Sequence, residues 1–353
     1  QGQTWSPLVD IEPSNGPAAS WVVPLLTPSG RIYVFYTYNG DKISLGRDDV
    51  HGWYAMKYSD DNGQSWSSQR YRLPLRQTAC DQLVKDGQLV QMFWGIDKPK
   101  IMDGTVYFAF TKLGDYFLKD GEGWLFASDN ILAVTDPDEI HWELRPQGEN
   151  GIRKPEFGTT QEEHNLVPLG GSRLYCVYRT TRGFPCHSYS DDGGRSWGTP
   201  EPMTYSPVGR VVRNPRACPK LWKCSNGKYL FWYHLHGGPN FAGQYPQPGG
   251  LNFNGRNPAW IIGGVVRDGH MYWSQPEILL YAKDPDVRMS YPDLIEQNGR
   301  YWVTETQKTI ARIHEVDAEL LNGMWAQLDG TLPDTPVTRD CSLDVTDFDA
   351  VAA

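Results

Sequence analysis

YSDDNGQSW at residues 58–66 and YSDDGGRSW at residues 189–197 are two copies of one pattern, Ser-x-Asp-x-Gly-x-Ser-Trp, placed 131 residues apart. In each copy an aspartate can accept backbone N–H groups inside a tight turn, because a short acidic side chain folds back on its own main chain. The glycine can adopt positive φ, and the tryptophan can pack at the exit of the turn. Both copies follow strand-like alternation, so they predict two equivalent β-hairpin turns.

A second repeat recurs at about half that spacing. Five segments consist of an apolar run, a turn glycine and an aromatic-rich strand, and their glycines are Gly30, Gly104, Gly171, Gly227 and Gly299. Successive glycines are 74, 67, 56 and 72 residues apart. Four-stranded units that recur at such a period, with long loops, are typical of a β-propeller.

The repeated turn resembles the Asp-box, or BNR repeat, of sialidase-like β-propellers. The resemblance covers most of the chain and implies an all-β propeller of six blades, with five blades as the alternative. Residues 84–93 are the candidate for the sixth hairpin. We expect one domain over residues 1–328 that an N-terminal strand at residues 4–11 closes, so that no sheet edge is left exposed. A short helix is expected near residues 316–324, and an extended tail at residues 329–353.

The composition fits a large all-β domain, since 36 Gly, 26 Pro and 19 Tyr accompany few helical patterns. A net charge of −9 argues against nucleic acid as a partner, because a phosphate-binding surface must be basic. No apolar run is long enough to cross a bilayer, so we expect no membrane insertion. The resemblance to sialidase-like glycan enzymes implies a secreted or periplasmic location. Six cysteines show no metal-site spacing. A bridge between Cys176 and Cys186 is a minor alternative, and the oligomeric state is left open.

Propeller topology sorts the chain into two faces. Strands alternate in direction, so the starts of the innermost strands share one face with the loops between second and third strands, and the Asp-box turns lie opposite. A central depression that gathers acidic, basic and aromatic residues is the default position for an active site. The candidate binding residues are Trp21, Lys100, Arg179, Arg216, His234, His236 and Asp293, and the candidate catalytic residues are Asp49, Glu163, His164 and Tyr291.

The resemblance to sialidases extends to single residues. Glu163, which precedes a hairpin whose second strand ends at Arg179, is similar to the family's glutamate and its following substrate arginine. The segment 290–294 resembles the family's late tyrosine segment, which implies that Tyr291 is a nucleophile activated by Glu163. Asp49 lies in the first long loop, where the family keeps its acid. The resemblance therefore implies a glutamate, a tyrosine and an aspartate as catalytic groups.

Each candidate also has a structural alternative. Glu163 could be a polar loop residue, and His164 could hydrogen-bond a neighbouring blade. Arg179 and Arg216 suit acidic sugars, but a structural ion pair between blades is nearly as common, and Arg179→Ala is expected to impair substrate use with little loss of stability. The His-x-His pair at residues 234–236 has no third ligand, so it is weak support for a metal.

One departure from the family separates this chain from true sialidases. The first blade of sialidases begins with Arg-Ile-Pro, whose arginine binds the sialic acid carboxylate, whereas Val22-Val23-Pro24 stands here. A valine cannot form the bidentate, charge-assisted hydrogen bonds of such a clamp. We therefore expect a sugar other than sialic acid.

The favoured function is an exo-acting glycoside hydrolase that removes a terminal sugar from an oligosaccharide or polysaccharide, with Tyr291 as nucleophile. One alternative is a polysaccharide lyase acting at a uronate, in which His164 or His234 abstracts a proton and Arg179 with Arg216 neutralises the carboxylate. Another alternative is a non-catalytic glycan-binding propeller. We expect no required cofactor, and a structural calcium ion in the central channel is left open.

Overall fold

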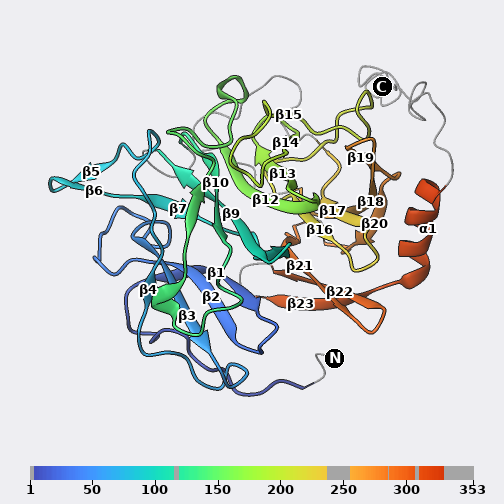
Figure 1. Cartoon of the computed structure of the whole chain (residues 1–353). Coiled ribbons are helices and arrows are strands. Elements are labelled where there is room, and N and C mark those ends of the chain that lie inside the picture. Colours follow the sequence, from blue (N-terminus) through green and yellow to red (C-terminus); the bar gives the residue numbers. More distant parts are fainter. Residues whose placement is uncertain (1–3, 115–118, 237–254, 285, 307–309, 330–353) are drawn as a thin grey trace.

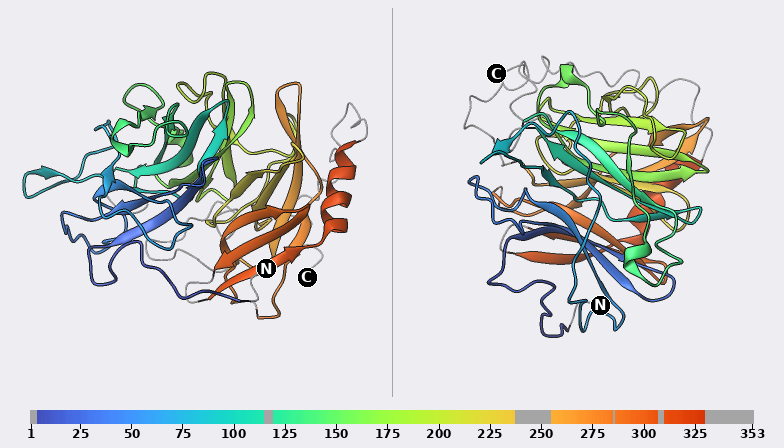
Figure 2. Two further views of the ribbon diagram at one scale, coloured as in Figure 1. Left: turned by 60° about the horizontal axis from the view of Figure 1, so that its bottom comes forward. Right: turned by 60° about the vertical axis from the view of Figure 1, so that its left-hand side comes forward.

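The computed structural model describes residues 4–114, 119–236, 255–284, 286–306 and 310–329 (Figure 1). Five antiparallel sheets follow one another in chain order around a common centre, which confirms the sialidase-like β-propeller (Figures 1 and 2). Among the described residues, no helix is long and apolar enough to cross a membrane.

The first three blades hold the first half of the chain. Blade 1 contains β1 (Ala19–Leu26), β2 (Ile32–Tyr38), β3 (Trp53–Ser59) and β4 (Tyr71–Arg72). In blade 2 the innermost strand is interrupted, and the blade contains β7 (Met92–Trp94), β8 (Lys100–Met102), β9 (Thr105–Leu113), β10 (Glu122–Ser128) and β11 (Glu143–Arg145). Blade 3 contains β12 (Gln161–Gly170), β13 (Arg173–Thr180), β14 (Pro185–Ser190) and β15 (Glu201–Pro202). Two short 3-10 helices, η1 (Pro137–Glu139) and η2 (Pro155–Phe157), lie in the connecting loops.

The last two blades complete the ring. Blade 4 contains β16 (Lys220–Lys223), β17 (Tyr229–Tyr233), β18 (Ala259–Arg267), β19 (His270–Trp273) and β20 (Glu277–Leu280), and blade 5 contains β21 (Ser290–Gln297), β22 (Arg300–Thr306) and β23 (Ala311–Val316). The expected helix is present as α1 (Ala318–Asp329), which packs on β18. Gly263 permits this contact, because a Cβ there would lie 2.9 Å from the Trp325 ring.

The ring has five blades, the alternative count, and not the favoured six. The expected sixth hairpin forms only β5 (Val84–Lys85) and β6 (Gln88–Leu89), which pair with each other and project from the ring (Figure 1). The rest of that segment, β7, pairs with β9 of blade 2. Two residues per strand are too few for an independent sheet, and Val84 is 62% exposed.

The prediction of an N-terminal closing strand is wrong. Residues 4–18 contain no strand and pack instead on the outer side of blade 1. There Glu12 accepts hydrogen bonds from Arg70 at 2.6 and 2.5 Å, and the Ile11 carbonyl accepts one from Lys57 at 2.8 Å. These polar anchors lie at the end of the segment, whereas Leu8 is 97% exposed and has no apolar face to join. Among the described residues, β23 is therefore the outermost strand of blade 5.

Both Asp-box turns have the predicted hydrogen bonds. Asp61 accepts from the Ser65 backbone at 2.9 Å and from the Ser65 hydroxyl at 2.5 Å, while Ser59 Oγ accepts from the Gly63 N–H at 2.8 Å. These bonds from Ser65 lower the pKa of Asp61 to about 2. Gly63 has a φ of 82°, which a side chain would disfavour. The turns lie at the ends of β3 and β14, on the face opposite the starts of the innermost strands.

Aromatic side chains fill the spaces between blades. Phe35 of blade 1 stacks near Phe108 of blade 2, with ring centroids 4.8 Å apart, and Tyr54 lies 5.1 Å from Phe93. The disulfide alternative is wrong, because Cys176 and Cys186 are buried free thiols. In the register of β13 and β14, Cys186 lies opposite Tyr178 and not opposite Cys176. The blades are therefore held together by packing, which fixes the strand starts around the centre.

Candidate active site

Three innermost strands share one irregularity near their starts. The register of β1, β12 and β21 shifts between Ser20 and Val23, between Glu162 and Asn165, and between Ser290 and Asp293. Inside each shift one residue has a left-handed backbone, namely Trp21 (φ 61°), Glu163 (φ 60°) and Tyr291 (φ 50°). Such φ values are uncommon for side chains of this size, and bulges of this kind often re-aim side chains at functional sites. Three equivalent bulges in one ring therefore mark the candidate active site.

Two glutamates and two arginines form a buried cluster at this position. Arg179, at the end of β13, holds Glu162 at 2.6 and 3.1 Å and forms a close ion pair with Glu163. Arg216 reaches the same Glu162 oxygen at 3.2 Å. All four side chains are less than 10% exposed. Burial and the neighbouring charge of Arg179 lower the pKa of Arg216 to about 10.

A third arginine joins the cluster from blade 4. Arg256 donates to Ser290 Oγ at 2.6 Å and to the Arg216 carbonyl at 3.1 Å. Burial and the charge of Glu163 raise the pKa of Tyr291 to about 12, while Arg179 and Arg256 act in the opposite direction. Glu163 Oε1 is paired with Arg179, whereas Glu163 Oε2 has no hydrogen-bond donor among the described residues. Glu163 thus retains capacity to accept a proton beside Tyr291.

An aromatic wall bounds the cavity in front of Tyr291. Trp21 stacks on Trp94 with centroids 5.4 Å apart and meets Tyr291 edge-on at 6.1 Å. A cavity of about 340 Å³, which we call the site cavity, is lined by Trp21, Val22, Val23, Pro24, Gly95, Ile96, Lys98, Cys218, Lys220, Tyr291, Pro292, Asp293 and Thr306. Val22, which replaces the clamp arginine, is 52% exposed. The cavity is therefore apolar on the side of blade 1 and charged on its floor.

Asp49 lies beside this wall. Its backbone carbonyl accepts a hydrogen bond from the Trp21 indole at 2.7 Å, and its carboxylate is bound by Arg47 at 2.9 and 2.5 Å. Arg47 in turn lies 5.9 Å from the centre of the Trp94 ring. The loop that carries the predicted acid is thus anchored to the aromatic wall, with the carboxylate covered by Arg47.

His164 does not reach the site cavity. The imidazole is fully buried, bonded to Thr111 Oγ1 at 2.9 Å and to the Ile152 carbonyl at 3.0 Å, and it stacks on Tyr178. Burial lowers the pKa of His164 to about 3. Both ring nitrogens are occupied, so the side chain links blades 2 and 3. This is the structural alternative given for His164, a hydrogen bond to a neighbouring blade.

The two other candidate histidines follow β17 in blade 4. His234 is buried, with Nδ1 3.2 Å from the Pro258 carbonyl and with Nε2 lacking a hydrogen-bond partner among the described residues. His236 Nε2 lies 2.5 Å from the Gly255 carbonyl. Within the described ranges, no group of three or more His, Cys, Asp or Glu side chains is placed to hold a metal. The pair therefore gives no support to a metal site.

Lys100 and Asp293 line the central channel. Lys100 is bonded to Asp97, and Asp293 is bonded to Lys98. Asp293 borders the site cavity, whereas Lys100 borders a second cavity further along the channel. Of the two, only Asp293 is thus placed to meet a ligand in the site cavity.

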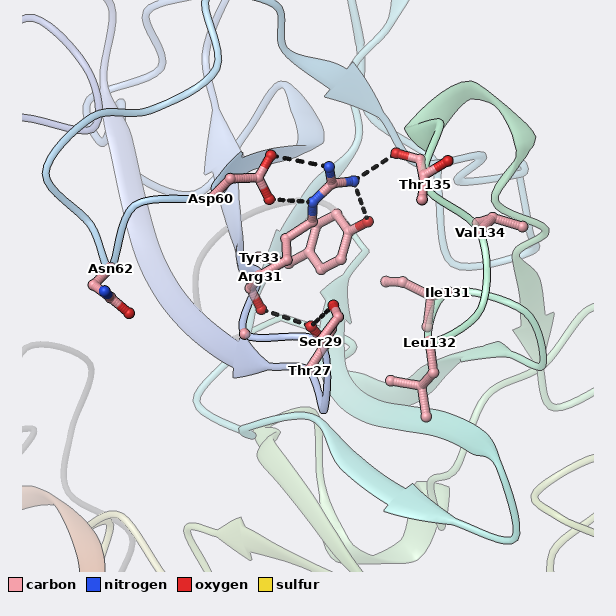
Figure 3. Close-up of a pocket in the computed structure, with 11 residues that line it drawn as sticks. Thr27, Ser29, Arg31, Tyr33, Asp60, Asn62, Ile131, Leu132, Val134 and Thr135 are labelled. Carbon is pink, nitrogen blue, oxygen red and sulfur yellow. Dashed lines mark hydrogen bonds and ion pairs between the residues drawn. The ribbon is translucent and has the colours of Figure 1, made fainter.

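A larger cavity, of about 510 Å³, lies far from these groups on the Asp-box side of blades 1 and 2 (Figure 3). Its central side chain, Arg31, donates to Asp60 at 2.7 and 3.0 Å, to the Thr135 carbonyl at 2.6 Å and to Tyr33 at 3.2 Å. The guanidinium group is thus bonded within blade 1 and, through the Thr135 carbonyl, to blade 2. This cavity is therefore a structural seam and not a candidate site.

The structure adds three residues to those predicted. Glu162 directly precedes the candidate Glu163, Arg256 follows a sequence segment rich in glycine and asparagine, and Trp94 is one of 14 tryptophans. None of the three has a local sequence signal that separates it from ordinary surface or core residues. Their roles appear only when the blades bring them beside Arg179, Tyr291 and Trp21.

Comparisons with known proteins agree with this architecture. The sequence profile of the BNR repeat-like domain matches residues 1–303. No curated protein sequence matches the chain.

Solved structures show the same fold. The Hadza microbial sialidase Hz136 superposes with a TM-score of 0.54 at 17% identity, over 86% of this chain and 52% of that chain. The intramolecular trans-sialidase from Ruminococcus gnavus gives 0.54 at 14% identity, over 86% and 79%. A protein of unknown function from Dyadobacter fermentans gives 0.56 at 13% identity, over 86% and 76%. The chain spans about half the length of the Hadza sialidase chain, and at these identities the likeness concerns the fold.

Proposed function

The chain belongs to the BNR repeat-like domain family, and from that premise we propose that it is an exo-acting glycoside hydrolase. It would remove a terminal sugar from an oligosaccharide or polysaccharide in a secreted or periplasmic setting. The observation that carries this proposal is the convergence of Trp21, Glu163 and Tyr291, each on a left-handed bulge of a different blade. The sialidases among the structural neighbours lend support to a glycosidase.

In the proposed reaction Tyr291 attacks the anomeric carbon. The phenol proton passes to Glu163 Oε2, which lacks a hydrogen-bond donor among the described residues, and Arg179 with Arg256 stabilises the phenolate. Asp49 gives a proton to the leaving oxygen, which requires that Arg47 release the carboxylate and that the carboxylate take up a proton from solvent when substrate binds. Water then cleaves the glycosyl-tyrosine bond with Asp49 as base, and Glu163 returns its proton to the released Tyr291. The product retains its anomeric configuration.

The proposed sugar is not sialic acid. Val22 supplies an apolar surface to the site cavity at the position of the clamp arginine, so it can give a sialic acid carboxylate no charge-assisted hydrogen bond. Three arginines are present in the cluster, but Arg179 and Arg216 are already bonded to Glu162. Efficient cleavage of a sialyl aryl glycoside, measured beside arabinosyl and rhamnosyl aryl glycosides, would contradict this part of the proposal.

The lyase alternative loses one of its two bases, because His164 lies outside the site cavity with both nitrogens occupied. His234 is the remaining candidate for that chemistry. The glycan-binding alternative would use Trp21, which packs on the buried Trp94, and would need no carboxylate.

The test is product analysis on a panel of neutral and uronate-containing glycans. A released free sugar supports the hydrolase, an unsaturated uronate supports the lyase, and binding without product supports the non-catalytic alternative. Mass spectrometry after reaction with a 2-fluoro glycoside of the active sugar should find the label on Tyr291. Tyr291→Phe serves as the control, and labelling elsewhere would remove Tyr291 as nucleophile.

A further inference from the structure

Two cavities meet inside the central channel. The site cavity of about 340 Å³ and a second cavity of about 370 Å³ have Lys98, Lys220 and Asp293 in common. The second cavity extends to Ser225 and Glu296, near the turns on the Asp-box side of the ring. We call the three shared residues the neck, because they lie where one cavity passes into the other.

Lys220 of the neck is a buried cation without an acidic partner. It is the first residue of β16 and is 3% exposed. Its ammonium group donates to the Ile96 carbonyl, and among the described residues it forms no ion pair. Burial of an ammonium group is costly unless an opposite charge compensates it.

The other charges near the neck do not supply that compensation. Lys98 is paired with Asp293, and Lys100 is paired with Asp97. Asp97 also accepts hydrogen bonds from the Ala109 N–H at 2.8 Å and the Leu166 N–H at 3.4 Å. Three ammonium groups therefore face two carboxylates. Burial lowers the pKa of Lys100 to about 8, and the charge of Lys220 acts in the same direction.

We propose that the neck binds a small anionic group, held by Lys220 and Lys98. Two ammonium groups act as point donors, which suit a chloride ion, a phosphate ion or a carboxylate. The group has two possible sources, since a free inorganic anion could enter the channel and an acidic group of a ligand could reach down from the site cavity. A calcium ion is disfavoured here, because it requires six to eight oxygen ligands and both carboxylates are bonded to lysines. This inference stands apart from the proposed hydrolase activity.

The test titrates sodium phosphate and sodium chloride against the whole chain at constant ionic strength, with sodium HEPES as the reference salt. The melting temperature of the wild type should rise saturably with at least one of the two anions. Lys220→Met keeps the aliphatic volume and should weaken the apparent affinity by about tenfold, the loss for one charged hydrogen bond. Lys283→Met is the matched control, because Lys283 is exposed in the same blade and lines neither cavity.

A second variant should increase the anion affinity. Asp293→Asn removes the carboxylate that holds Lys98, so anion affinity should increase by about tenfold. This variant keeps the proposal testable if Lys220→Met does not fold, since Asp293 is partly exposed. Competition between phosphate and galacturonate, with no competition from galactose, would identify a ligand's acidic group as a source.

Three results would overturn the proposal. One is an equal anion response in the Lys220 and Lys283 variants, which would indicate general screening. Another is weaker binding in Asp293→Asn. The third is no stabilisation of the wild type by either sodium salt.

Discussion

The two faces of this propeller differ in what is repeated from blade to blade. On the Asp-box face, Ser65 and Ser196 each donate their N–H to an aspartate at 2.9 Å, and Gly63 and Gly194 each donate to a serine hydroxyl at 2.8 Å. On the site face the bulges repeat, but the residues in them are a tryptophan, a glutamate and a tyrosine. Repetition of side chains thus specifies the fold, and divergence at a repeated backbone position supplies the chemistry.

The strongest challenge to this comparison is Arg179→Ala, which should affect the fold as well as the site. The change leaves Glu162 and Glu163 as buried carboxylates without their main partner, so we expect a loss of about 3–5 kcal/mol in the free energy of unfolding, measured by urea denaturation. Arg173→Ala is the control. Arg173 begins the strand that holds Arg179, and it forms an exposed ion pair with Asp191. Equal stability of the two variants would contradict the buried cluster.

The sequence predicts that Arg179→Ala leaves stability nearly unchanged, whereas the buried cluster predicts a large loss of stability. The sequence places this arginine correctly at the end of a strand beside the site. It gives no sign that the side chain is only 2% exposed and bonded to two glutamates.

Glu163→Gln and Tyr291→Phe should each lower kcat by about 10² or more while the protein remains folded, because each removes one proton-transfer or nucleophilic partner. Glu296→Gln lies at the other end of β21 and serves as the control. The measurement is initial rates on the glycoside that the product analysis identifies. Turnover like that of the wild type in either site variant would remove that residue from the mechanism.

Acid sensitivity separates the structural histidine from the site. Burial lowers the pKa of His164 to about 3, whereas the unfolded chain titrates near 6.5. The unfolded state binds more protons between these values, so stability is complete above pH 6.5 and falls as the pH is lowered. At pH 5 His164 should cost about 2 kcal/mol relative to pH 7, and His164→Gln should flatten this dependence in urea denaturation. An unchanged slope in the variant would refute the assignment.

The smallest expected effect is at the Asp-box turns. Asp61→Ala and Asp192→Ala should each lower the melting temperature by about 2–6 °C, because the turn N–H groups lose their acceptor. Turnover per folded molecule should stay the same. Asp129→Ala, at the corresponding exposed turn of blade 2, should change neither quantity. Stable but inactive Asp-box variants would reverse the assignment of the two faces.

Local chemistry explains which parts of the structure were predictable. The Asp-box turns and the five glycine hairpins depend on residues a few positions apart, so their sequence patterns were sufficient. The bulges were not predictable, because a left-handed Glu163 or Tyr291 is imposed by the packing of neighbouring blades and has no signature of its own. The prediction of six blades was wrong for a related reason, because residues 84–89 alternate like a strand but lack a partner sheet.

The absence of a strand common to blades 1 and 5 in the described chain gives the ring a seam that side chains alone close. Trp21 and Tyr291 face each other across that seam and also border the site cavity. A ligand that contacts both side chains would bridge blades 1 and 5 and stabilise the closed ring. Ligand binding should then slow amide hydrogen exchange most strongly in β1 and β21. The exchange rate of these two strands would therefore measure how far the ligand stabilises the closed ring.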